Sequence, residues 1–125
     1  RVGRRFMPEA SFVSGVEMTG VYDTDEGVTL PDGMVRYASF EDMLKEVDAV
    51  YVATPHLSHY DYIRRSLEAG KHVLCETPLV LSGDEARELY QLAEDKELML
   101  MEANKTAHCP AFNHLMVMVK SIRLQ

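Results

Sequence analysis

Two short apolar segments that each end at a polar residue and a proline constrain the fold more than any other feature of the chain. The first is D-A-V-Y-V-A-T-P at residues 48–55, and the second is H-V-L-C-E-T-P at residues 72–78. A segment with helical spacing of apolar residues follows each one. This alternation is typical of parallel strands in an α/β sheet, and open sheets bind ligands at the carboxyl ends of such strands. We therefore expect the functional site at residues 54–55, at residues 76–78 and at the end of the next strand.

The rest of the chain continues the alternation of strands and helices. Ser39 is predicted to cap a helix, Ser82 and Glu85 match a capping box, and Gly70 is placed to end a helix. The sequence predicts an α/β fold, a Rossmann-like doubly wound parallel sheet with right-handed crossovers. Further strands are expected at residues 16–22, 35–37 and 98–101, a loop at 23–33, and helices at 58–69, at 82–96 and from Pro110 onward.

Composition excludes several classes of function. The 125 residues are enough for one domain, and a hydrophobic content of 46% is typical of a globular protein. The net charge of −7 argues against nucleic-acid binding, and no apolar run is long enough to span a membrane. The two cysteines lack metal-ligand spacing, so a reduced, cytoplasmic protein is expected.

The two ends of the chain indicate a piece of a longer protein. The chain opens at Arg1-Val2-Gly3, at the start of a predicted helix with no strand before it. We expect a dinucleotide-binding domain at residues 1–109, without its first strand, and a linker helix at residues 110–125. That helix is expected to lead to an α/β substrate domain that is absent from this chain.

Gly3 and Asp23 match the last part of a dinucleotide-binding fingerprint. In G-x-G-x-x-G the third glycine allows close packing of a helix on a strand, and an acid about 20 residues later binds ribose hydroxyls. The pyrophosphate lies against the helix N-terminus in such folds. Two residues in this pattern also occur by chance, so the fingerprint needs support from the rest of the chain.

Residues 48–59 and 67–78 resemble the glucose–fructose oxidoreductase / inositol dehydrogenase (Gfo/Idh/MocA) family. The family patterns there are D-a-V-x-v-a-t-P-x-x-x-H and a-l-x-a-G-K-H-V-l-c-E-K-P. Residues 98–103 and Pro110 are also similar to the family's next strand and linker helix. The resemblance covers nearly the whole chain. It implies a Rossmann domain that binds NAD or NADP, followed in family members by an α/β domain that carries the substrate and often the oligomer contact.

The resemblance also implies which residues bind the cofactor. Asp23 would accept hydrogen bonds from the adenine ribose. Its carboxylate repels a 2′-phosphate, and no Arg or Lys lies within residues 24–33, which favours NAD over NADP. The other expected contacts are Arg1, Val2 and Gly3 at the pyrophosphate, Thr54, Pro55, His56 and His59 along the groove, and Glu76 and Thr77 beside the nicotinamide ribose.

Thr77 is a departure, because the family usually has a catalytic lysine between the Glu and the Pro. Threonine can donate a hydrogen bond but cannot act as an acid near neutral pH. We hypothesise that Lys105, which follows the next strand on the same sheet edge, replaces that lysine. A solvated surface lysine is the alternative. His108 is a further acid–base candidate with a structural alternative. His56 and His59 are spaced like metal ligands, but no third ligand completes a site, so no metal is expected.

The function that these features favour is an NAD(P)-dependent oxidoreductase. It would transfer hydride between the nicotinamide and a sugar, polyol or related hydroxy compound. Two alternatives stay open, namely a glycosidase-like enzyme that uses NAD without net redox, and a non-catalytic dinucleotide-binding regulator. The expected partners are a small-molecule substrate and, through the second domain, other copies of the chain in a homo-oligomer, with no nucleic acid and no membrane.

Overall fold

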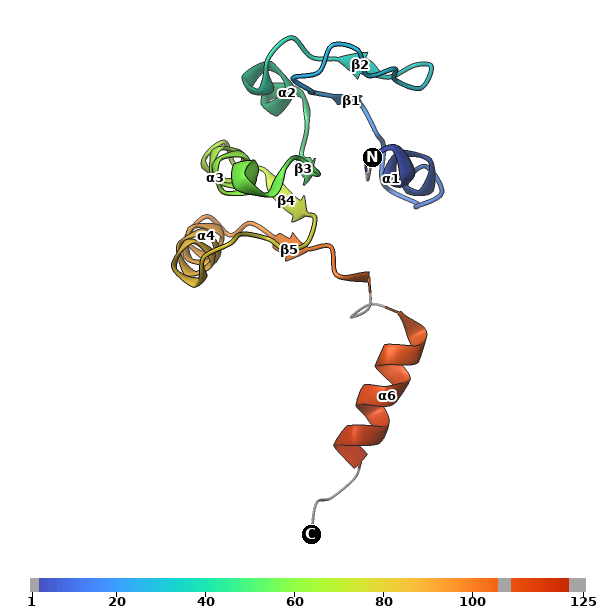
Figure 1. Ribbon diagram of the computed structural model, residues 1–125, viewed down its shortest axis with the longest axis vertical. Coiled ribbons are helices and arrows are strands. Elements are labelled where there is room, and N and C mark those ends of the chain that lie inside the picture. The colour runs from blue at the N-terminus through green and yellow to red at the C-terminus, as the bar shows by residue number, and fades with distance from the viewer. Residues whose placement is uncertain (1–2, 106–108, 122–125) are drawn as a thin grey trace.

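The computed structural model describes residues 3–105 and 109–121, and it alternates strands with helices as the sequence predicts (Figure 1). The elements in chain order are α1 (Gly3–Ala10), β1 (Gly20–Val21), β2 (Val35–Arg36), α2 (Phe40–Glu46), β3 (Ala49–Val52), the short 3-10 helix η1 (His56–Ser58), α3 (His59–Glu68), β4 (His72–Cys75), α4 (Gly83–Asp95), β5 (Leu100–Glu102) and α6 (Pro110–Ser121).

Every strand pair in the described residues is parallel, which confirms the predicted α/β class. The strands form a two-stranded sheet, β1–β2, and a three-stranded sheet in the order β3–β4–β5. In the larger sheet Val50 pairs with Val73, and Val73 pairs with Leu100. Each strand of this sheet connects to the next through a helix, so neighbouring strands end at the same edge. The arrangement is Rossmann-like.

Aromatic contacts place the end of the smaller sheet beside the carboxyl edge of the larger one. Tyr22 follows β1, and its ring centroid lies 6.4 Å from that of Tyr62. Tyr62 belongs to the first turn of α3, which begins just after the carboxyl end of β3. Phe40 lies between them, with its ring centroid 4.8 Å from Tyr62 and 5.8 Å from Tyr22. The residues after β1 therefore lie near the edge at which β3 and β4 end.

The core lies between the three-stranded sheet and helices α3 and α4, and it extends to buried residues of α2. Alternate residues of β3 and β4 are buried, as a sheet with one covered face requires. The second face of β3 is less covered, since Ala49 is exposed and Tyr51 is half-buried. On that second face Figure 1 shows α1, whose Phe6 stacks on Tyr51 at 3.9 Å. The core residues are Phe40, Met43, Leu44, Val50, Val52, Ile63, Leu67, Val73, Cys75, Leu79, Leu89, Ala93 and Leu100.

Strand β1 is shorter than the predicted strand at residues 16–22. Only Gly20 and Val21 pair with β2, and Val16 is 49% exposed. A Cβ atom at Gly20 would lie 2.4 Å from the backbone oxygen of Val35, so the close approach of β1 to β2 requires glycine there. The length of β1 is set by the number of residues that β2 offers for pairing, and the apolar composition of residues 16–22 does not reveal that number.

Ser39 and Ser82 are helix N-caps as predicted, although the Ser82 hydroxyl bonds the amide of Asp84 and not that of Glu85, as a capping box would. The Ser39 hydroxyl accepts a hydrogen bond from the Asp42 amide at 3.1 Å, and the Ser82 hydroxyl accepts one from the Asp84 amide at 3.2 Å. Gly70 follows α3 with φ +77°, a conformation that side chains rarely adopt. These local signals are strong because each satisfies backbone groups that a helix end leaves free.

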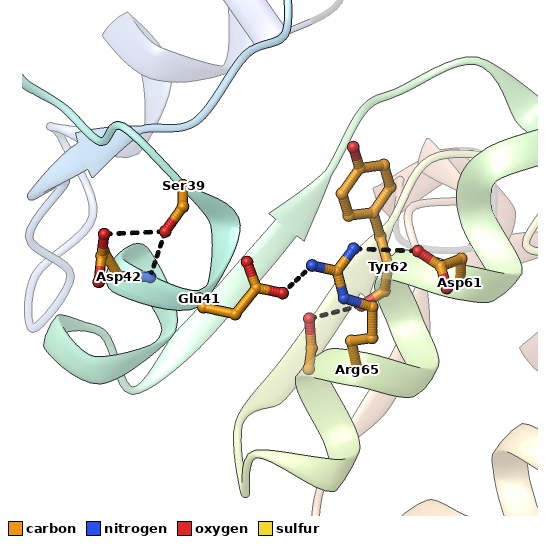
Figure 2. A network of polar contacts seen from close by, with 7 residues as sticks. Ser39, Glu41, Asp42, Asp61, Tyr62 and Arg65 are labelled. Atoms are coloured by element: carbon orange, nitrogen blue, oxygen red, sulfur yellow. Dashed lines mark hydrogen bonds and ion pairs between the residues drawn. The ribbon is translucent and has the colours of Figure 1, made fainter.

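Figure 2 shows how α2 is joined to α3. Arg65 on α3 binds the carboxylate of Glu41 on α2 and lies 3.1 Å from the carboxylate of Asp61 on its own helix. Its guanidinium also covers the Phe40 ring, 4.8 Å from the centroid. These contacts fix α2, the element that connects the two sheets, against the larger half of the molecule.

Candidate functional site

The first part of the site is the loop after β3. The Ser58 hydroxyl lies 2.9 Å from the Thr54 hydroxyl and donates to the Pro55 carbonyl at 2.7 Å. Thr54 is half-buried, whereas Pro55 and His56 are exposed. The loop then passes through η1 into α3. The predicted groove residues Thr54, Pro55 and His56 therefore lie together at the end of β3, two of them open to solvent.

The second part is the segment after β4. Glu76 is half-buried, and its carboxylate accepts a hydrogen bond from the Tyr51 hydroxyl, which comes from the neighbouring strand. Burial, and then this hydrogen bond, raise the pKa of Tyr51 well above its ordinary value, so the phenol keeps its proton and donates it. Thr77 is exposed and precedes Pro78 through a cis peptide bond. The segment thus places the Glu76 carboxylate, which Tyr51 orients, and the exposed Thr77 hydroxyl at the sheet edge.

The third part is the end of β5. Glu102 is half-buried and accepts a hydrogen bond from the Leu79 amide at 2.9 Å. Lys105 lies three residues further along the chain and is exposed. The amide of Ala103 binds the carbonyl of Cys75 at 2.7 Å, so the chain after β5 still follows the end of β4. Lys105 therefore follows β5 at the carboxyl edge of the sheet, as predicted.

Asp23 lies in the loop after β1 and is exposed. Its carboxylate accepts a hydrogen bond from the Asp25 amide at 2.8 Å, and the Asp25 carboxylate accepts one from Gly27 at 2.9 Å. Arg36 on β2 donates to the carbonyls of Asp25 and Val28. A cation thus lies beside this loop although none occurs within residues 24–33. Sheet pairing brings it there, because Val21 pairs with Arg36.

The side chain of His59 lies beneath the edge rather than on it. It has no exposed surface, and its two ring nitrogens lie within hydrogen-bond distance of backbone carbonyls from both neighbouring segments. Direct contact between this side chain and a cofactor, as the sequence suggested, does not fit such burial. Gly3 begins α1 as predicted. The remaining predicted residues, Arg1, Val2 and His108, lie outside the described residues.

Two residues at this edge were not predicted from the sequence as site residues, namely Tyr51 and Glu102. Glu102 ends a parallel strand, so the rule that selected Glu76 also applies to it. Tyr51 occupies the position of β3 that pairs with Leu74, two residues before Glu76. Only the strand register shows that its hydroxyl reaches that carboxylate.

Within the described residues no group of three or more His, Cys, Asp or Glu side chains is placed to hold a metal ion. No helix there has the length and apolar character needed to cross a bilayer. The polar groups at the edge include a carboxylate after β1, a hydroxyl after β3, a carboxylate and a hydroxyl after β4, and the Glu102 carboxylate and Lys105 amine at and after the end of β5.

Comparison with known proteins agrees with this arrangement. The family described as "Oxidoreductase family, NAD-binding Rossmann fold" matches residues 1–104, and the chain belongs to this Gfo/Idh/MocA family. Biliverdin reductase A of Mus musculus is 51% identical over 70 residues, which cover 54% of this chain and 24% of that protein. The scyllo-inositol 2-dehydrogenase (NADP(+)) IolU of Bacillus subtilis is 30% identical over 118 residues, 89% of this chain and 36% of that protein.

A solved structure is similar over most of the chain. A mutant of KijD10, a 3-ketoreductase from Actinomadura kijaniata in complex with TDP-benzene and NADP, matches with a TM-score of 0.80 and 30% identity. The match covers 94% of this chain and 39% of that one. The chain therefore spans well under half the length of these relatives, and it corresponds to the part of them that has a Rossmann fold.

Proposed function

We propose that this chain is the cofactor-binding part of an NAD(P)-dependent oxidoreductase that acts on a sugar, polyol or related hydroxy compound. The observation that carries the proposal is the gathering of Thr54, Glu76 and Thr77 at one edge of a parallel sheet in a member of this family. A bound nicotinamide supplies the hydride chemistry. The chain's own residues bind and orient the cofactor along the edge.

The donors and acceptors present fit such a cofactor. Among the described residues, the Asp23 carboxylate accepts one hydrogen bond, at Oδ1, so its second oxygen is available for ribose hydroxyls. Glu76 is held by Tyr51, which fixes one carboxylate oxygen and leaves the other for a second ribose. Gly3 begins α1, and a helix N-terminus suits a pyrophosphate.

The choice between NAD and NADP rests on charges near Asp23. The carboxylate repels a 2′-phosphate and favours NAD, whereas Arg36 beside the same loop and the NADP-dependent relatives favour NADP. We propose NAD because the Asp23 carboxylate is exposed to a ligand. The Arg36 guanidinium is half-buried and already donates to the carbonyls of Asp25 and Val28. Titration with NADH and NADPH under the same salt conditions tests the proposal of NAD, and tighter binding of NADPH would contradict it.

Lys105 is proposed to move the proton during turnover in place of the lysine that Thr77 replaces. Its exposed position after β5 and its place at the carboxyl edge support this role. Lys105→Met should abolish turnover and leave NADH affinity nearly unchanged. Lys71→Met is the matched control, because Lys71 precedes β4 at the opposite edge. Unchanged turnover in Lys105→Met would remove Lys105 from the mechanism.

We propose that β1–β2 and β3–β4–β5 belong to one Rossmann sheet within residues 1–109. We also propose that α6, described at Pro110–Ser121, belongs to the expected linker at residues 110–125 and leads toward a substrate domain. Homo-oligomer contacts through the second domain and a cytoplasmic location remain predictions from the sequence. The length of the relatives supports a second domain, since each matched region is well under half of the relative.

The activity is tested with the full-length protein, a panel of sugars and polyols, and both nicotinamide cofactors. Appearance of reduced nicotinamide absorbance with one substrate supports the proposal. Product formation without net reduction would favour the glycosidase-like alternative instead. Tight cofactor binding with no turnover on any compound would favour a regulator, the reading to which Thr77 lends weight.

A further inference from the structure

His59 is a fully buried polar side chain at the start of α3. A buried imidazole is costly unless its nitrogens have hydrogen-bond partners. No part of the ring reaches the surface, so the side chain has no direct contact to offer a ligand. Its partners therefore determine what it does in the site.

Those partners lie on both segments that carry the proposed cofactor contacts. Nε2 is 2.9 Å from the Thr54 carbonyl oxygen, in the loop after β3. Nδ1 is 3.0 Å from the Pro78 carbonyl oxygen and 3.2 Å from that of Leu79, in the segment after β4. The ring thus lies within hydrogen-bond distance of both segments.

The hydrogen atoms of the ring decide how the bridge is made. A carbonyl oxygen only accepts, so each nitrogen that bonds one must carry a hydrogen, and a neutral ring has a hydrogen on one nitrogen. Cys75 gives Nδ1 another partner at 3.3 Å. Burial raises the pKa of Cys75 to about 12, and the thiol hydrogen remains available for that contact. A neutral ring with its hydrogen on Nε2 donates to the Thr54 carbonyl and accepts from the Cys75 thiol at Nδ1, so it contacts the loop after β3 and the end of β4 at the same time.

The segment after β4 is also held from its other side. The Leu79 amide donates to Glu102 at 2.9 Å, while the Leu79 carbonyl lies within hydrogen-bond distance of His59. Residues further along both segments line one pocket of about 170 Å³, among them His56 and Leu57 after β3 and Leu81 after β4. Beneath these residues, His59 adds a contact between the segments to the hydrogen bond that Tyr51 makes with Glu76.

We propose that His59 is a positioning residue that joins the loop after β3 to the segment after β4 and so sets the spacing between Thr54 and Glu76. The inference rests on the proposed function, because that spacing matters only to a ligand that touches both segments. A whole nicotinamide dinucleotide touches both. ADP, which lacks the nicotinamide ribose beside Glu76, does not need the spacing.

The test compares two ligands on variants of the full-length protein. His59→Ala removes both ring contacts, and His59→Gln retains an amide hydrogen that can reach one segment. We expect NADH affinity to fall about 10-fold in His59→Ala and less in His59→Gln, as loss of a buried hydrogen bond predicts. ADP affinity should stay within about 2-fold of the wild type in both. If His59→Ala does not fold, His59→Gln alone carries the comparison.

His72→Gln is the matched control, because His72 also hydrogen-bonds backbone, accepting from the Met99 amide at 3.0 Å, but at the amino end of β4. It should leave both affinities unchanged. Equal losses of NADH and ADP affinity in the His59 variants would reduce His59 to a purely structural role and overturn the inference, as would no loss at all. Failure of the wild type to bind either NADH or NADPH would instead overturn the proposed function, and this inference with it.

Discussion

The two sheets of this molecule are built very differently, although both contribute to the proposed site. In the three-stranded half, β3 and β4 pair over four residues each, and Ile63, Leu67 and Leu89 behind them have no exposed surface. In the two-stranded half, only two residues of each strand pair, and Val35 is 52% exposed. The half that carries Glu76 is therefore held by extensive packing, whereas the half that carries Asp23 is held by the contacts of Tyr22 and Tyr37 with the core and by local hydrogen bonds.

A binding edge can therefore combine a well-packed part with a lightly packed part. Regions with few buried apolar contacts open at low free-energy cost, while packed strands open only with the whole domain. The loop at Asp23 keeps its shape through turn hydrogen bonds and through Arg36. We expect the nicotinamide side to be preformed and the adenine side to become ordered when the cofactor binds.

The largest expected effect comes from the packed half. Leu67→Ala should lower the free energy of unfolding by about 2–5 kcal/mol, because Leu67 is fully buried and its truncation leaves a cavity. Val35→Ala, in the other half, should change it by less than about 0.5 kcal/mol. Urea unfolding measured for both variants makes the comparison. Similar losses for the two would show that the halves are equally packed.

The next effect concerns binding at the lightly packed half. Asp23→Ala should weaken NADH binding roughly 10- to 100-fold, as loss of charge-assisted hydrogen bonds to ribose predicts. NADPH binding should be unchanged or tighter, because the repulsion of its 2′-phosphate is removed. Isothermal titration calorimetry measures both. Asp32→Ala, in the same exposed loop, is the control, and an equal loss in that variant would mean that the loop rather than the Asp23 carboxylate is responsible.

Removal of helix caps should have a smaller effect on stability. The two halves should differ in how much of the helix exchanges its amide hydrogens faster as a result. Ser39→Ala and Ser82→Ala should each cost about 1 kcal/mol of stability, since each hydroxyl caps a helix. α2 has seven residues and α4 has thirteen, so amide exchange should accelerate along all of α2 but only in the first turn of α4. Hydrogen exchange followed by mass spectrometry reads this out. Faster amide exchange along the whole of both helices would argue against a difference in packing between the two halves.

The smallest effect is expected at the junction of the halves, where Glu41 binds Arg65. That hydrogen bond lowers the pKa of Glu41 below its ordinary value. The pair therefore stabilises the fold at pH values above the ordinary carboxyl pKa, and this contribution disappears as the pH falls through the lowered pKa. Glu41→Gln should be slightly less stable than the wild type at neutral pH and equal to it in acid.

Thermal melts across this pH range test the junction, with Glu46→Gln as the control. Glu46 is exposed on the same helix and forms none of the ion pairs found in the described residues. A deficit of Glu41→Gln that persisted in acid would exclude the ion pair as its cause.

The sequence predicted the packed half more accurately than the other, for physical reasons. The apolar runs of β3 and β4 and the serine caps act through residues close in sequence, and the structure confirms them. The length of β1 depends on how far β2 runs beside it, which no local pattern states.

The same distinction applies to the candidate site. Thr54 and Glu76 were found because each ends a strand. The bridge made by His59 and the contact of Tyr51 with Glu76 were not found, because both join residues that only the register and the helix crossing bring together. Arg36 reaches the loop after Asp23 for the same reason.

Binding of a dinucleotide at the carboxyl edge is tested most directly by hydrogen exchange of the full-length protein with and without saturating NADH or NADPH. We expect slower exchange at that edge, in peptides covering residues 23–28, 53–58 and 76–80, with the largest change in the first of these. Peptides at the amino edge, around residues 46–49 and 70–72, should not change. Protection confined to the amino edge, or no protection with either cofactor, would contradict the placement of a dinucleotide on this sheet.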